Sequence, residues 1–321
     1  MIELFRNPSY DFIGKRRWAY IASAVFITIG LLSMAAKGGL KYDIDFAGGT
    51  LIQVRFERAP SVAQIRASLS RIELGESVIQ EFGDPREFIF RMPILAMSSE
   101  EITKRVQGAL AADPALGKPE IRRVEFVGPK VGRDLQLQAL YAVLAGLVVI
   151  LLYIAVRFDL KGGVAAVAAV FHDVLVSVTA LSLTNREFSL DVLAALLTII
   201  GYSVNDTIVA YDRLRENRGK IGGQRNLSFA QQMNTAINQT LSRTVLTALT
   251  VFFSTAILLF FGGKVLEDMA FTLFVGVITG TYSTVYIAGA LVVDWTQYVE
   301  GRVRRGKKAM AKSDPRVKSN I

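Results

Sequence analysis

Six long apolar segments limit the fold of this chain more than any other feature. A helix needs about 20 residues to cross a hydrocarbon core about 30 Å thick. Residues 18–36, 135–156, 162–185, 191–211, 244–263 and 269–293 each have the necessary length. Within hydrocarbon every backbone polar group needs a partner in its own segment, and a helix provides one. Since 51% of all residues are also hydrophobic, the sequence predicts an integral membrane protein with six transmembrane helices.

The positive charges of the connecting segments indicate how these helices are oriented. Lys and Arg are enriched in the short loops that face the cytoplasm. Six helices place both termini on one side, where the polar segments contain twenty Lys and Arg residues, whereas the short loops opposite contain only Arg186 and Lys264. We therefore expect cytoplasmic termini and an outer location for residues 37–134, which means the periplasm in a Gram-negative cell.

Residues 301–321 form a basic tail, with eight Lys and Arg residues and a single acid, Asp314. Each basic residue near a membrane gains about 1 kcal/mol from anionic headgroups. A nucleic-acid-binding segment would need aromatic or groove-reading residues between the charges, and this tail has no aromatic residue. The tail therefore predicts contact with the membrane surface and no nucleic-acid partner.

Residues 37–134, between the first two spans, are numerous enough for a small domain. Strand composition marks 50–56, 77–82, 87–92 and 121–127, while the capping-box pairs Ser61/Gln64 and Ser98/Glu101 begin two helical segments. This order predicts an α+β ferredoxin-like domain. The domain contains neither His nor Cys and its charges nearly balance. We therefore expect a binding or mechanical domain without catalytic chemistry or a metal site.

The rest of the chain divides around the spans. Residues 1–36 are the expected cytoplasmic N-terminus and first helix, and 135–300 contain the other five helices. Within 212–243, a polar cytoplasmic segment, apolar residues recur every four positions from Phe229 to Leu241, as in an amphipathic helix. Its other face is rich in Asn and Gln. We therefore expect this helix to pack beneath the bundle and to bring Arg243 to the start of the fifth span.

Asp206, inside the fourth span, is a candidate functional residue. A carboxylate at membrane depth costs several kcal/mol unless it is protonated, paired or facing water within the protein. Asp206 lies about 7 to 10 Å inside the cytoplasmic end of its helix, on the face of Tyr202 and next to Asn205. Arg243 enters the next span at a compatible depth, so the geometry allows an ion pair that protonation would break. A purely structural pair, or a side chain that extends to the membrane surface, is the alternative.

His172 and Asp173 lie near the middle of the third span. Histidine changes charge near neutral pH, so the two residues are a second candidate proton relay. A neutral histidine that is hydrogen-bonded to a neighbouring helix explains the same position without any proton transfer. The sequence alone supports both interpretations equally.

Several of these segments together resemble the SecF family, the smaller member of the bacterial SecD–SecF pair in the RND transporter superfamily. The resemblance follows six motifs in order along almost the whole chain. They are YDFIGKRR, YDIDFAGGTLIQVRF, VEFVGPKVGRDL, FHDV, GYSVNDTIVAYDRLREN and NQTLSRTVLTALT.

The resemblance implies an auxiliary subunit of protein export in the bacterial inner membrane. Together with SecD, such a subunit uses the proton-motive force to draw unfolded preproteins from the SecYEG channel on the periplasmic side, after SecA has acted. It implies no enzymatic reaction and no cofactor besides the proton gradient. In the family the Asp of the NDT motif and the Arg of the LxRT motif take part in proton passage, and these are Asp206 and Arg243 here.

Two other functions are consistent with the sequence. Six spans with one external domain resemble half of a transporter, so the chain is alternatively a subunit of an RND-type efflux transporter for small molecules or lipids. The small, charge-balanced external domain argues against efflux. The other alternative is a scaffold in which Asp206 and Arg243 form a static bond, and there apolar residues at both positions would be tolerated.

Overall fold

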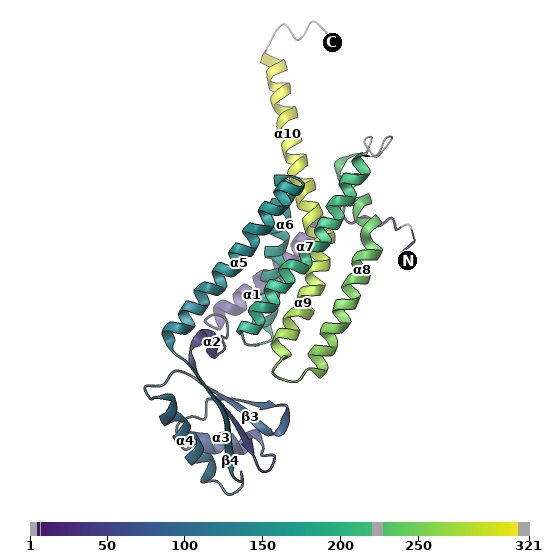
Figure 1. Cartoon of the computed structure of the whole chain (residues 1–321). Coiled ribbons are helices and arrows are strands. Elements are labelled where there is room, and N and C mark those ends of the chain that lie inside the picture. The colour runs from purple at the N-terminus through teal and green to yellow at the C-terminus, as the bar shows by residue number, and fades with distance from the viewer. Residues whose placement is uncertain (1–4, 7, 220–226, 314–321) are drawn as a thin grey trace.

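The chain folds into a bundle of long helices with a small α/β unit at one end (Figure 1). The computed structural model describes residues 5–6, 8–219 and 227–313. The last helix of the chain leaves the bundle at the end opposite to the sheet (Figure 1). This arrangement places the α/β unit and the C-terminal helix on opposite sides of the apolar helices.

Six helical stretches of the described residues are long and apolar enough to cross a membrane, which confirms the predicted six spans. The first five are α1 (Arg16–Ala36), α5 (Pro129–Arg157), α6 (Leu160–Leu183), α7 (Leu190–Gly219) and α8 (Phe229–Phe261). Several of these helices continue past their apolar segments, because a helix keeps its backbone hydrogen bonds on both sides of a membrane boundary. Buried side chains concentrate in α6, α7 and the sixth span, which therefore lie at the centre of the bundle.

The sixth span is interrupted by a wider helical turn. It comprises α9 (Glu267–Ser283), the π-helix η2 (Thr284–Ala288) and α10 (Gly289–Ser313), which continue one another. Short π-helical turns inside α-helices often occur at functional sites. The beginning of the predicted basic tail is thus the end of α10, and residues 314–321 lie outside the described residues.

The segment expected to pack beneath the bundle is instead the first part of α8, which runs on into the fifth span without a break. Ser228 and Gln231 form the predicted capping box at its start. Its amide face binds the segment before α1: Asn238 Oδ1 accepts a hydrogen bond from the Tyr10 backbone N–H at 2.9 Å, and Asn234 Oδ1 accepts one from Phe12 at 2.8 Å. The Asn residues therefore attach the N-terminal segment to α8.

The α/β unit lies between α1 and α5 in the chain. It begins with a short helix that the sequence did not predict, α2 (Ile44–Ala47), and continues with β1 (Gly49–Phe56), α3 (Val62–Ser70), β2 (Val78–Phe82), β3 (Asp84–Met92), α4 (Ser99–Ala111) and β4 (Pro119–Val127). The strands form an antiparallel sheet in the order β2-β3-β1-β4. Ile52 and Phe90 face each other across β1 and β3 and pack with Ile65 of α3 and Ile102 of α4 in one core.

Ion pairs connect this unit to the helical bundle. Arg91 of β3 contacts Asp43 at 3.1 Å and Glu187, in the α6–α7 connection, at 3.1 Å. Lys41 also binds Glu187, at 3.0 Å. Arg91, Asp43 and Glu187 are largely shielded from solvent, so salt screens their contacts less than it screens ordinary surface ion pairs. The sheet is therefore fixed to the loop that joins two central helices.

Gly276 and Gly280 bring α9 unusually close to α7. A Cβ atom added to Gly276 would lie 2.1 Å from Cδ1 of Ile199, and one added to Gly280 would lie 3.3 Å from Cβ of Ser203. The two glycines, four residues apart, thus form a GxxxG packing face. It also brings Ser203, one turn before Asp206, against the last span.

Candidate functional site

Asp206 lies inside the bundle, with only 3% of its surface exposed. Its Oδ2 atom has no hydrogen-bond partner within the described part of the chain. Tyr202 is half-buried, and its hydroxyl likewise has no such partner there. The neighbouring Asn205 is exposed on the outer face of α7. Of these three predicted residues, only Asp206 is therefore an enclosed ionisable group with an unpaired oxygen.

The expected ion pair between Asp206 and Arg243 is not formed. Among the described residues no ion pair within 4 Å joins the two side chains, although the charge of Arg243 acts on the Asp206 carboxyl group over a longer distance. The reason is the rotation of α8: Arg243 is exposed, whereas the adjacent Thr244 is buried. Arg243 lines a hollow of about 570 Å³ together with Asp212 and Gln239.

A second polar cluster occupies the centre of the bundle around Asp173, which is completely buried. One oxygen, Oδ2, accepts hydrogen bonds from the hydroxyls of Ser203 at 2.6 Å and Ser283 at 2.7 Å. The other, Oδ1, lies 3.0 Å from Nδ1 of His172. Helices α6, α7 and α9 therefore meet at a single carboxyl group.

His172 extends this cluster to the first span. Its Nε2 atom lies 2.9 Å from the hydroxyl of Ser23, which lies 3.2 Å from the hydroxyl of Tyr282. The Tyr282 hydroxyl in turn donates to the carbonyl of Ala19 at 2.8 Å. Both ring nitrogens of His172 thus have partners, and the polar chain reaches from α1 to α7.

The two buried carboxyl groups, of Asp173 and Asp206, differ in how many hydrogen-bond donors and cations surround them. An ionised carboxylate in a low-dielectric interior needs hydrogen-bond donors or a nearby cation. Asp173 has donors on both oxygens, whereas Asp206 has a distant cation and an unpaired oxygen. Gain or loss of a proton at Asp206 would consequently change its interactions without breaking an existing contact. No three His, Cys, Asp or Glu side chains of the described residues gather as metal ligands.

Sequence reasoning identified the two carboxyl groups but missed most of their neighbours. Ser23, Ser203, Tyr282 and Ser283 are ordinary residues in apolar helices, where serine also bonds to its own backbone. The one signal was the three-residue spacing from Ser203 to Asp206, which places both on one side of α7. Nothing in the sequence indicates that this side faces Asp173.

Fold and site together define a multi-pass membrane protein whose helices enclose two carboxyl groups. The family model described as "Protein export membrane protein SecD/SecF, C-terminal" matches residues 109–298. The protein translocase subunit SecF of Desulfurispirillum indicum is 43% identical over 92% of this chain and 94% of its own length. That of Calditerrivibrio nitroreducens is 42% identical over 91% and 96%. The chain belongs to the SecF family of protein translocase subunits, which confirms the resemblance in its motifs.

Solved structures agree with this assignment. The crystal structure of SecDF from Thermus thermophilus, titled a translocon-associated membrane protein, matches with a TM-score of 0.78 and 42% identity, over 91% of this chain and 39% of that chain. SecDF in its super-membrane-facing form matches with a TM-score of 0.70 and 40% identity, over 96% and 41%. This chain is therefore similar to one part of a longer SecDF protein.

Proposed function

We propose that this SecF-family chain couples the proton-motive force to the export of unfolded preproteins, with Asp206 as the group that binds and releases the proton. The observation that carries the proposal is the environment of Asp206, which is buried with an unpaired oxygen and within reach of the Arg243 charge. Ionisable residues at membrane depth commonly mark ion pathways.

The proposed orientation places both termini in the cytoplasm and residues 37–134 in the periplasm. The twenty-to-two distribution of basic residues supports it. The β-α-β-β-α-β succession of the α/β unit and its four-stranded antiparallel sheet support our proposal that it is a ferredoxin-like domain. In our proposal it contacts the emerging preprotein, and its ion pairs with Glu187 transmit movements of α6 and α7 to it.

We also propose a SecD-type subunit as the second half of the transporter, with the SecYEG channel and SecA as further partners. Polar residues on the outer faces of α7 and α8 support a second subunit: Asn205 and Arg243 are both exposed at membrane depth in the isolated chain. Lipid does not satisfy such groups, whereas an adjoining helix does. The relative SecDF of Thermus thermophilus carries both names in one chain.

His172 and Asp173 fit a positioning role better than proton transfer, because each has hydrogen-bond partners on both of its polar atoms. We propose that they hold Ser203, and with it the turn of α7 that carries Asp206, against α9. A proton relay through Ser23 is the alternative, and it requires the exchange of existing hydrogen bonds.

Preprotein release from membrane vesicles, measured with and without a proton gradient, tests the coupling proposal. Asp206→Asn should assemble normally but should no longer respond to the gradient. The matched control is Asp212→Asn, which removes a carboxylate from the same helix, where it pairs with Arg157 at 2.9 Å. Release that remains gradient-dependent in Asp206→Asn would contradict the proposal.

A further inference from the structure

A cavity of about 380 Å³ lies at the end of the bundle from which α10 extends. Its walls come from four helices: the start of α6, the last turns of α7, the first turns of α8 and α10. This volume is within the range of ligand-binding pockets. Tyr211, Leu214 and Arg215 of its wall belong to the same motif of α7 as Asp206, but neither Asp206 nor Asp173 lines the cavity, so it needs a separate explanation.

The cavity changes from apolar to cationic along α7. Tyr211 and Leu214 line its inner part, nearer the membrane centre, and both are buried. Arg215 and Arg218 follow on the next turns, nearer the end of the helix, and both are exposed. On α8, which faces α7 across the cavity, Met233 lies nearer the membrane centre than Phe229. This order, apolar inside and positive outside, is the polarity of a site for an anionic amphiphile.

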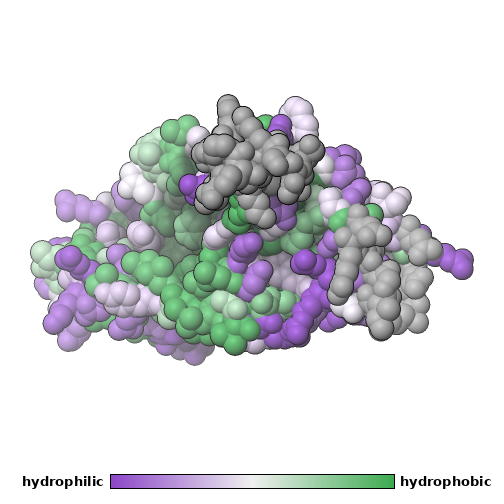
Figure 2. All heavy atoms as spheres, turned by 90° about the horizontal axis from the view of Figure 1, so that it is seen from above, coloured by the Kyte–Doolittle hydropathy of each residue, from purple (hydrophilic) through white to green (hydrophobic). Residues whose placement is uncertain are grey.

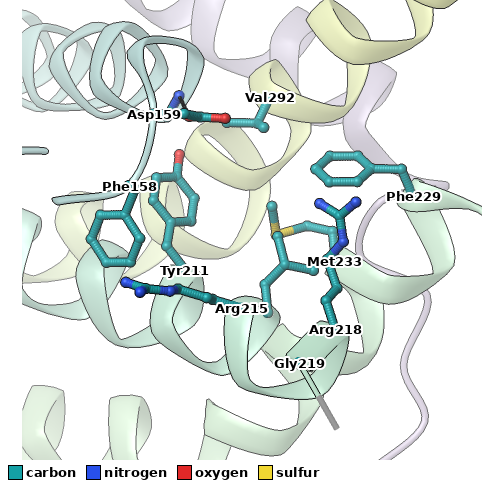
Figure 3. Close-up of a pocket in the computed structure, with 11 residues that line it drawn as sticks. Phe158, Asp159, Tyr211, Arg215, Arg218, Gly219, Phe229, Met233 and Val292 are labelled. Atoms are coloured by element: carbon teal, nitrogen blue, oxygen red, sulfur yellow. Dashed lines mark hydrogen bonds between the residues drawn. The ribbon is translucent and has the colours of Figure 1, made fainter. Parts of the chain in front are cut away.

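The two arginines extend to different sides of the cavity. Figure 3 shows Arg215 directed towards Phe158 and Tyr211, and Arg218 directed towards Phe229. The Arg218 guanidinium lies 5.6 Å from the centroid of the Phe229 ring. In the described part of the chain, neither arginine forms an ion pair with an acidic side chain. Arg215 donates one long hydrogen bond, from Nη1 to the Arg157 carbonyl at 3.5 Å, so within these residues neither charge has an anionic partner.

Asp159 is the one carboxylate among the described residues of the cavity wall, and it is already engaged. Asp159 caps the N-terminus of α6, where its Oδ1 accepts a hydrogen bond from the Gly162 N–H at 2.6 Å. The helix dipole further compensates its charge. The mouth of the cavity therefore has a net positive charge, from Arg215 and Arg218.

The cavity lies where the lipid-facing surface of α5 ends. Arg157 is the last residue of α5, and Phe158 and Asp159 of the cavity wall follow it directly. A shallow outer hollow contains Tyr153, Val156 and Arg157, and it shares Arg215 with the cavity. Figure 2, which looks onto this end, shows hydrophobic surface next to hydrophilic residues. A lipid of the adjoining leaflet can therefore reach Arg215 from the membrane.

We propose that this cavity binds an anionic phospholipid, with acyl carbons between Tyr211, Leu214 and Met233 and the phosphate group at Arg215 and Arg218. Basic pockets between transmembrane helices are established sites for such headgroups. Arginine suits this role, because its planar guanidinium binds phosphate oxygens in pairs. The site does not depend on whether Asp206 carries protons.

Native mass spectrometry of the full-length protein, purified with its membrane partners in mild detergent and titrated with phosphatidylglycerol, tests the proposal. The double variant Arg215→Gln/Arg218→Gln should retain the lipid at least tenfold more weakly than the unchanged chain. Both residues are exposed, so the variant should fold, and a thermal melt verifies this. Phosphatidylcholine should bind both proteins equally weakly.

The matched control removes two positive charges from the same end of the molecule, outside the cavity. Lys15 and Arg17, at the start of α1, are both exposed, and Lys15→Gln/Arg17→Gln should leave lipid retention within twofold of the unchanged protein. An equal loss in both double variants would overturn the proposal, because it would show a general charge effect. Unchanged retention in the Arg215/Arg218 variant, or full displacement of the lipid by inorganic phosphate, would overturn it as well.

Discussion

Replacement of Asp173 by alanine should destabilise the bundle more than any other single change in its centre. The substitution removes the acceptor shared by Ser203 and Ser283 and leaves His172 without its Nδ1 partner. Because Asp173 is completely buried, water does not replace these contacts. Helices α6, α7 and α9 would lose their common polar connection.

The expected magnitude follows from the number of lost hydrogen bonds. Polar side-chain contacts within membrane proteins average about 0.6 kcal/mol and reach about 1.7 kcal/mol. The three contacts of Asp173 therefore correspond to a loss of about 2 to 5 kcal/mol in the free energy of unfolding. The matched control, Ser177→Ala, lies one turn further along α6, is equally buried and donates a single bond to the Asp173 carbonyl. It should cost about 0.6 kcal/mol.

Equilibrium unfolding of both variants in mixed detergent micelles measures this difference. Asp173→Ala should unfold at a clearly lower denaturant concentration than Ser177→Ala, and the two slopes should agree. Equal stability of the two variants would refute the reasoning that the carboxyl group joins three helices.

Three further predictions concern helix packing and the contacts between parts of the chain. Gly276→Leu should destabilise the bundle by about 1 to 3 kcal/mol through overpacking against Ile199, and Ile199→Ala should restore part of the loss in thermal melts. Arg91→Gln removes the ion pairs to Asp43 and Glu187. It should broaden the distribution of distances between a spin label on the sheet and one on α7. An unchanged distribution would contradict the inference that these ion pairs fix the sheet to the bundle. Asn234→Ala with Asn238→Ala should speed amide hydrogen exchange of residues 8–13, whose backbone these side chains bind, while exchange in α6 stays the same.

The six spans could be predicted because, within a membrane, an apolar segment satisfies its backbone hydrogen bonds mainly as a helix. The α/β unit could be predicted as well, since Ser61 and Ser98 mark helix starts and alternation marks the strands. The short helix at Ile44–Ala47 and the π-helix at Thr284–Ala288 could not. Four residues carry too little periodicity for a helix to be recognised, and the π-helix has no distinct residue pattern.

Residue spacing predicts how deep each site residue lies along its helix, but not how the helix is rotated about its own axis. Residue spacing gives the level of Asp206 and of Arg243 along their helices, because each residue adds a fixed rise. It does not give the angle at which two helices face each other, and Arg243 lies on the exposed side of α8. For the same reason, the meeting of Ser203, Ser283 and Asp173 depends on tertiary packing that only the folded chain reveals.

Infrared difference spectroscopy tests most directly whether the Asp206 carboxyl group takes up and releases a proton. Spectra of the assembled protein are recorded while the pH is changed, with Asp206→Asn and Asp212→Asn compared under the same conditions. We predict a carboxylic-acid carbonyl band that appears with proton uptake in the unchanged protein and in Asp212→Asn, and that is missing in Asp206→Asn. The same band at full strength in Asp206→Asn would contradict the assignment of this residue as the proton-binding group.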